Sequence, residues 1–151
     1  MSDATIHDRS AYDPDRDGPF SEWLRDRSAW TDATRHRFVE EYRSGTLDDD
    51  TFARYLVQDY QFLEVGARVT ALAASQAHTM DEMGRLSDSL AVLTGGDHVV
   101  DAFEEYTGWL CDQLDAYGPR LAPERQARVA AIFDRTVDLE AAFFDAAYDG
   151  D

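Results

Sequence analysis

Apolar residues recur every three or four positions over almost the whole chain, and this spacing restricts the fold more than any other feature. A period of about 3.6 places such residues on one face of an α-helix, whereas a half-buried strand needs strict alternation. No convincing alternating run and no repeat of fixed period is present in the sequence. Glycine and proline interrupt the pattern at Gly45, Gly95-Gly96, Gly118-Pro119 and Pro123. The sequence therefore predicts an all-α fold, a helical bundle.

Five helical segments are expected between these breaks, over about 19–44, 49–78, 83–93, 99–117 and 123–147, and the first could be interrupted near Thr31. Gly45 suits the position that ends a helix, because glycine adopts a left-handed backbone without a steric penalty. Asp48 suits the N-cap of the second segment. Pro123 suits the first turn of the last segment, where its missing N–H is no loss.

Residues 1–18 are polar and rich in aspartate, so they are predicted to form a disordered acidic arm. The rest of the 151-residue chain, 19–151, is long enough for a single helical domain. No run of about 20 apolar residues is present, so no membrane span is expected. The start resembles no secretory signal, and the single cysteine, Cys111, fits a reducing compartment. We therefore expect a cytoplasmic protein.

The chain carries 31 acidic and 14 basic residues, giving a formal net charge of −17, and every basic residue is arginine. Nucleic-acid binding needs a basic surface, so this class of partner is not expected. The simplest interpretation is adaptation to concentrated salt, in which repulsion between acidic groups is screened. The alternative is an acidic surface for a basic partner, although no local acidic cluster supports it.

Two acids, Asp59 and Glu140, occupy positions that the helical period assigns to the core. Burial of an unpaired carboxylate is costly, so such acids are usually paired or functional. Tyr55 and Phe62 lie one turn from Asp59, and Phe143 lies one turn from Glu140. Aromatic rings can sandwich a flat, nitrogen-rich heterocycle while carboxylates accept its N–H groups. Burial would also raise the carboxyl pKa, which suits proton transfer near neutral pH.

The alternative is that each acid only pairs with an arginine such as Arg54, Arg68 or Arg135. Other kinds of site have weaker support. No glutamate has histidine three positions later, as a di-iron bundle requires. No metal and no cofactor is therefore expected. Cys111 has no histidine near it in the sequence that would activate it, so we expect it to be inert.

Three segments resemble the N-terminal signature of the TenA family: His36–Val39, Gly45–Leu47 and Gln58–Leu63. This family comprises thiaminase II and aminopyrimidine aminohydrolases on a fold similar to that of haem oxygenase. A further segment, Leu139-Glu140-Ala141-Ala142-Phe143-Phe144, is similar to the Leu-Glu-x-x-Phe-Trp sequence of the family's last helix. The resemblance covers residues 20–93 well and 99–148 loosely.

The resemblance implies roles for the two acids. Asp59 would hold the aminopyrimidine of thiamin or of its breakdown products, and Phe62 would line the same pocket. Glu140 would act as the catalytic acid/base, and Phe143 would pack on the ring. Tyr106 lies in a segment similar to the family's Tyr-x-x-Trp-Ile and becomes a candidate pocket residue, although it could match an earlier family tyrosine instead.

The chain also departs from the family pattern. Members are typically about a third longer, and the missing central stretch lies between Leu93 and Tyr106. In the family that stretch contains a Pro-Cys motif whose cysteine is the usual nucleophile, and no Pro-Cys occurs here. The resemblance implies a hydrolase of thiamin salvage. A non-catalytic pyrimidine-binding or regulatory protein without direct DNA binding is the alternative, as is a bundle whose acids only form ion pairs.

Loss of family helices would also uncover apolar surface on the helices that remain. Such surface is usually covered by a partner. We therefore expect a homo-oligomer.

Overall fold

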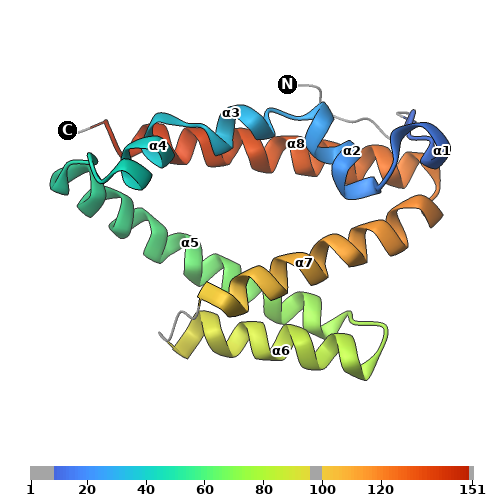
Figure 1. The fold of residues 1–151 in the computed structure, drawn as a ribbon. Helices are drawn as coiled ribbons and strands as arrows, with labels where there is room; N and C mark the ends of the chain where they lie inside the picture. The colour runs from blue at the N-terminus through green and yellow to red at the C-terminus, as the bar shows by residue number, and fades with distance from the viewer. Residues whose placement is uncertain (1–8, 96–99, 150–151) are drawn as a thin grey trace. The chain divides into compact units, whose positions relative to one another are not determined.

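The computed structural model describes residues 9–95 and 100–149, with only the backbone described for residues 95 and 100–104. All regular elements in this part of the chain are helices (Figure 1), which confirms the all-α prediction. They are α1 (Pro14–Asp17), α2 (Phe20–Arg27), α3 (Trp30–Thr34), α4 (Arg37–Ser44), α5 (Asp49–Ser75), α6 (Met80–Gly95), α7 (Val100–Tyr117), a short 3-10 helix η1 (Gly118–Arg120) and α8 (Pro123–Ala146). Among the described residues, no helix is both long and apolar enough to cross a membrane.

The chain divides into two compact units. The terminal unit combines Met1–Phe52 with Leu110–Asp151, and the central unit is Ala53–Trp109. Their boundaries fall within α5 and α7, so each of these helices has residues in both units. The single domain expected over 19–151 stays a prediction.

Local sequence signals define several helix ends. Gly45 has a φ of 69° and ends α4, as its position after an apolar run predicts. The Asp48 side chain accepts a hydrogen bond from the Thr51 amide at 3.0 Å, which confirms it as the cap of α5. Pro123 lies in the first turn of α8, also as predicted. The first expected segment, 19–44, is divided into α2, α3 and α4. Residues 96–99, where the fourth segment was expected to begin, lie outside the described residues.

The described part of the predicted disordered arm, residues 9–18, is ordered, which corrects that expectation. Asp13 caps α1, accepting from the Asp15 amide at 3.0 Å. The Tyr12 ring contacts Phe20 edge-to-face at a centroid distance of 5.0 Å, and its hydroxyl donates to the Gly18 carbonyl at 2.7 Å. The polar composition of the segment suggested disorder, but the packing of Tyr12 offsets the entropy cost of ordering it. Residues 1–8 lie outside the described chain.

The core of the terminal unit forms where α2, α3 and α4 lie along α8 (Figure 1). Phe20, Leu24 and Ala130 are fully or almost fully buried there. Partly buried residues surround these three: Tyr12, Trp23, Leu114, Val129 and Phe133. Asp115 of α7 accepts from the amide and the hydroxyl of Ser21, at 2.7 and 3.1 Å, and so caps the start of α2.

The central unit buries much less apolar surface. Among its described side chains, Leu86 alone is buried. Its large exposed apolar residues are Leu56, Val57, Tyr60, Phe62, Val65, Val69, Leu72 and Met80. The core position that the helical period assigns to Asp59 is therefore not a buried one, because Asp59 is half-buried and its neighbour Phe62 is exposed. Helical spacing shows which residues share a face, but it does not supply the element that covers that face.

Candidate functional site

Tyr55, Asp59 and Phe62 lie on one face of α5, because residues three and four positions apart are neighbours on a helix. Asp59 is half-buried rather than buried, and Phe62 is 57% exposed. The Tyr55 hydroxyl donates to Asp59 Oδ1 at 3.4 Å, a long hydrogen bond. An ionised carboxylate has about four acceptor positions, so Asp59 retains capacity to accept N–H groups from a ligand.

Asp59 makes no ion pair with any residue that the structure describes. Arg68, one of the proposed pairing partners, lies one turn from Glu64 and pairs with that residue. The interpretation that Asp59 is only one half of an ion pair is therefore wrong for the described residues. Glu64 and Arg68 are both well exposed, so their pairing adds little stability.

Glu140 and Phe143 lie three residues apart on α8, and both are half-buried. The Phe143 ring meets Phe144 edge-to-face at a centroid distance of 6.1 Å. Phe144 in turn stacks on Phe38 of α4 at 5.1 Å. This aromatic cluster fixes the part of α8 that presents Glu140, because packed aromatic rings restrict the helix that carries them.

His36 joins α4 to the same end of α8. Its Nδ1 accepts from the Phe38 amide at 3.2 Å and caps α4. Its Nε2 must then carry the ring proton, which it donates to Asp145 Oδ1 at 3.0 Å. The ring also stacks on Phe144 at 5.4 Å. Because both nitrogens have protein partners, His36 serves as a cap and a link between helices.

A further hydrogen-bonded group surrounds Glu41 of α4. Arg37 Nε and the Tyr148 hydroxyl donate to its two carboxylate oxygens, at 2.6 and 2.7 Å. The Arg37 guanidinium also lies 4.3 Å from the centre of the Tyr148 ring. The pKa of Tyr148 is raised to about 12, mainly by burial and next by the hydrogen bond to Glu41. The hydrogen bond from Arg37 lowers the pKa of Glu41 below its ordinary value.

Tyr106 lies on α7 and stacks on Trp109, with ring centroids 5.8 Å apart and an angle of 25° between the planes. The two rings line a pocket of about 220 Å³, which residues of α6 complete within the central unit. Asp59, Tyr55 and Phe62 do not line this pocket. The pocket thus joins Tyr106 to residues of α6, and that Tyr106 shares a ligand with the α5 residues stays a prediction.

The predicted site residues fall in both units. Tyr55, Asp59, Phe62 and Tyr106 belong to the central unit, whereas Glu140 and Phe143 belong to the terminal unit. The structure groups Tyr55, Asp59 and Phe62 on one face and Glu140 with Phe143 on another. That the two acids act on one ligand stays a prediction.

Sequence reasoning missed the surroundings of Cys111. Arg25 of α2 donates from Nη2 to the Cys111 sulfur at 3.1 Å, and the same guanidinium lies 5.3 Å from the centre of the Trp30 ring. Arg25 and Cys111 are far apart in the sequence, so no local signal could have revealed the contact. No group of three or more potential metal ligands exists among the residues that the structure describes.

The comparisons with known proteins agree on one relationship. Over 64 residues, or 42% of this chain and 30% of the relative, the sequence is 38% identical to an aminopyrimidine aminohydrolase of Helicobacter pylori. Over 92 residues, or 58% of this chain and 16% of the relative, it is 32% identical to a hydroxymethylpyrimidine/phosphomethylpyrimidine kinase of Saccharomyces cerevisiae.

The match thus spans less than a third of the length of either curated relative. No solved structure matches the chain. A family profile, that of the TENA/THI-4/PQQC family, matches residues 23–98, which is half of the sequence and runs from within α2 through α6. The chain therefore belongs to the TENA/THI-4/PQQC family.

Proposed function

We propose that the chain binds an aminopyrimidine derived from thiamin and hydrolyses it in thiamin salvage. The observation that carries the proposal is Asp59, a half-buried carboxylate without an ion pair among the described residues, set between Tyr55 and Phe62 on one helical face. Asp59 falls within the segment that matches the family. A relative that matches over part of the chain is named an aminopyrimidine aminohydrolase.

Each acid has a separate task in the proposed reaction. Asp59 accepts hydrogen bonds from the amino group and ring N–H of the pyrimidine, and Phe62 packs on the ring face. Glu140 transfers a proton to the departing amine as water supplies the hydroxyl group that replaces it. The bond between the pyrimidine methylene carbon and nitrogen breaks, a carbon–oxygen bond forms, and ammonia leaves. Phe143 packs on the pyrimidine ring on the side where Glu140 lies.

The test is release of ammonia from 4-amino-5-aminomethyl-2-methylpyrimidine by the purified chain. Glu140→Gln should abolish release while pyrimidine binding persists, and Asp59→Asn should weaken binding at least tenfold. Asp138→Asn on α8 and Glu64→Gln on α5 are matched controls, because each removes an exposed acid from the same helix. Unchanged binding by the Asp59→Asn chain contradicts the proposed site.

A second candidate function is pyrimidine binding without catalysis. The specific observation in its favour is the absence of Pro-Cys from the sequence, together with the contact of the one cysteine, Cys111, with Arg25. Under this alternative the wild-type chain binds the pyrimidine but releases no ammonia, and Glu140→Gln changes neither result.

We also propose that copies of this chain associate, because the exposed apolar residues of α5 need cover. Light scattering should give a mass above that of one 17.0 kDa chain, and Val57→Glu with Leu72→Glu should lower it. A monomeric wild type contradicts this proposal. We further propose adaptation to concentrated salt and lack of nucleic-acid binding on the basis of the net charge of −17, and a cytoplasmic location on the basis of the single cysteine.

A further inference from the structure

The pocket between α6 and α7 has a composition that sets it apart from the face around Asp59. It measures about 220 Å³, below the range of pockets for drug-sized ligands, and so suits a molecule built on a single ring. Arg85, Asp88 and Val92 of α6 line it at helical spacing, so they share one face of that helix.

The α7 side of the pocket is an aromatic wall. The Tyr106 and Trp109 rings stack at 5.8 Å and present an extended π surface. The Arg85 guanidinium lies 5.9 Å from the centre of the Trp109 ring. Aromatic faces attract cations, and a planar cation combines this attraction with stacking. The protein's own guanidinium therefore shows which kind of group this wall accepts.

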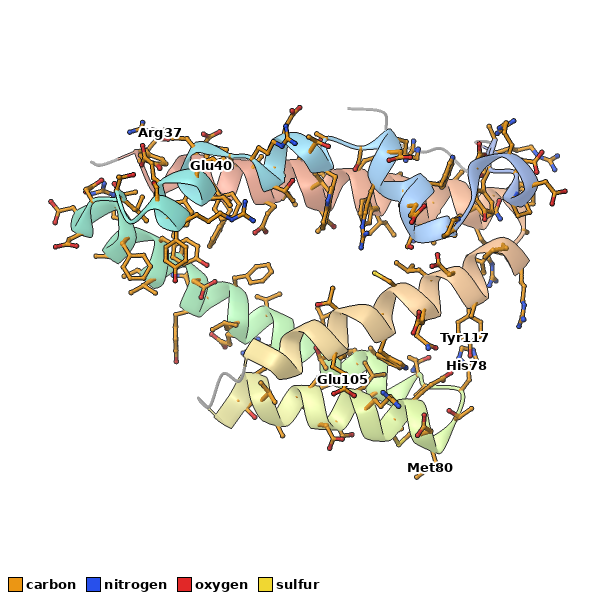
Figure 2. The ribbon with its side chains drawn as sticks, in the orientation of Figure 1. Arg37, Glu40, His78, Met80, Glu105 and Tyr117 are labelled. Atoms are coloured by element: carbon orange, nitrogen blue, oxygen red, sulfur yellow. The ribbon has the colours of Figure 1, made fainter. Side chains whose placement is uncertain are left out.

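The charge of the pocket favours the same kind of ligand. Asp88 of α6 and Glu105 of α7 (Figure 2) both line it and are exposed, and neither pairs with a described residue. Arg85 is engaged by Asp81, at 3.5 Å, as well as by Trp109. Two carboxylates from different helices thus remain to balance a positive ligand and to accept its N–H groups.

We infer that this pocket binds a planar heteroaromatic cation, stacked on Tyr106 and Trp109 and held through its N–H groups by Asp88 and Glu105. The inference goes beyond the proposed function and does not depend on it, because Asp59, Tyr55 and Phe62 do not line the pocket. A planar anion would meet two carboxylates, and a non-planar cation would lose the stacking.

The probe is 4-aminopyridinium, titrated calorimetrically into the full chain. Isonicotinate, a planar anion, and cyclohexylammonium, a non-planar cation, are the comparison ligands. The chain should bind 4-aminopyridinium at least tenfold more tightly than either of them. Asp88→Asn combined with Glu105→Gln should weaken this binding about tenfold, whereas Asp112→Asn, an exposed acid of α7 outside the pocket, should leave it unchanged.

Two further variants distinguish this site from its alternatives. Arg85→Gln should bind 4-aminopyridinium at least as tightly as wild type, because it removes a competing cation; weaker binding would overturn the inference. The Asp59→Asn variant should still bind 4-aminopyridinium, and loss of this binding would place the ligand on α5 instead. Equal affinity of the Asp88/Glu105 double variant and wild type would also overturn the inference. Failure of ammonia release bears only on the proposed function.

Discussion

The terminal and central units have similar helical patterns but differ in how they bury them. In the terminal unit, Phe20 and Leu24 are completely buried, and aromatic contacts join α3 and α4 to α8. In the central unit, Leu86 alone is buried among the described side chains, whereas Val57 and Leu72 of α5 are each 67% exposed. The two units therefore have the same helical spacing of apolar residues but bury very different numbers of these residues.

This difference shows how each unit is stabilised. The terminal unit has contacts between residues far apart in the sequence, such as Asp115 with Ser21 and Phe38 with Phe144. The described interactions of the central unit are mostly local, such as the pairs Arg68–Glu64 and Arg85–Asp81, each within one helix. Such exposed pairs contribute little to stability, and the exposed apolar residues of α5 are the basis of the association proposed above.

Matched phenylalanine substitutions test this comparison with the largest expected effect. Phe20→Ala should lower the free energy of unfolding by about 3–5 kcal/mol, because it leaves a cavity in a fully buried core. Phe62→Ala removes a ring that is 57% exposed and should cost under about 1 kcal/mol. Chemical denaturation of both variants measures the difference. Equal losses would mean that Phe62 is covered in solution, as the proposed association would allow.

Two glycine substitutions should have opposite signs. A Cβ added at Gly118 would overlap the Phe20 ring, so Gly118→Ala should destabilise the chain by about 1–3 kcal/mol. Gly66 lies inside α5 with nothing near its Cβ position, so Gly66→Ala should stabilise the chain by about 0.5–1 kcal/mol. Thermal unfolding gives both signs. A destabilising Gly66→Ala would reveal close packing on that face of α5.

Helix caps offer a smaller test, because the α6 cap in the central unit is made by neighbouring residues and the α2 cap in the terminal unit by a distant one. The α6 cap is local: Thr79 Oγ1 accepts from the Glu82 amide at 3.1 Å, and Glu82 accepts from the Thr79 amide at 3.3 Å. The α2 cap comes from the distant Asp115. Thr79→Ala and Asp115→Ala should each cost about 1–2 kcal/mol. Hydrogen exchange should locate the first loss in α6 and the second in α2, and exchange that spreads evenly would contradict this assignment.

The smallest effect near neutral pH is expected for Tyr148→Phe, which removes one hydrogen bond worth about 1 kcal/mol. Its pH dependence is more informative. The folded chain holds the Tyr148 proton up to a pKa of about 12, whereas the unfolded chain releases it near the ordinary value of 10.0. Stability should therefore fall as the pH rises from about 10 to about 12. Melting temperatures across this range should fall less steeply for Tyr148→Phe, and parallel profiles would contradict the shift.

Sequence patterns predicted the features that depend on neighbouring residues. The end of α4 at Gly45, the Asp48 cap and the start of α8 at Pro123 were all predicted, because turns and caps involve residues close in sequence. The resemblance carried by Gln58–Leu63 predicted the family, which the profile match confirms. The order of residues 9–18 escaped prediction, since it depends on Tyr12 meeting Phe20.

The candidate site divides in the same way. Spacing alone predicted that Tyr55, Asp59 and Phe62 share a face, and the α5 backbone confirms it. Spacing could not predict that Phe62 is exposed or that Tyr106 lines a pocket with α6. Nor could it predict the contact between Arg25 and Cys111.

The sequence by itself determined that this protein is helical, where several of its helices begin or end, and to which family it belongs. The periodicity and capping behind these features act over a few residues, so they can be read directly from the order of amino acids. Only the tertiary structure decided which apolar faces are buried and which polar groups meet. Those outcomes depend on contacts between distant segments, whose free energies appear only when the chain is folded.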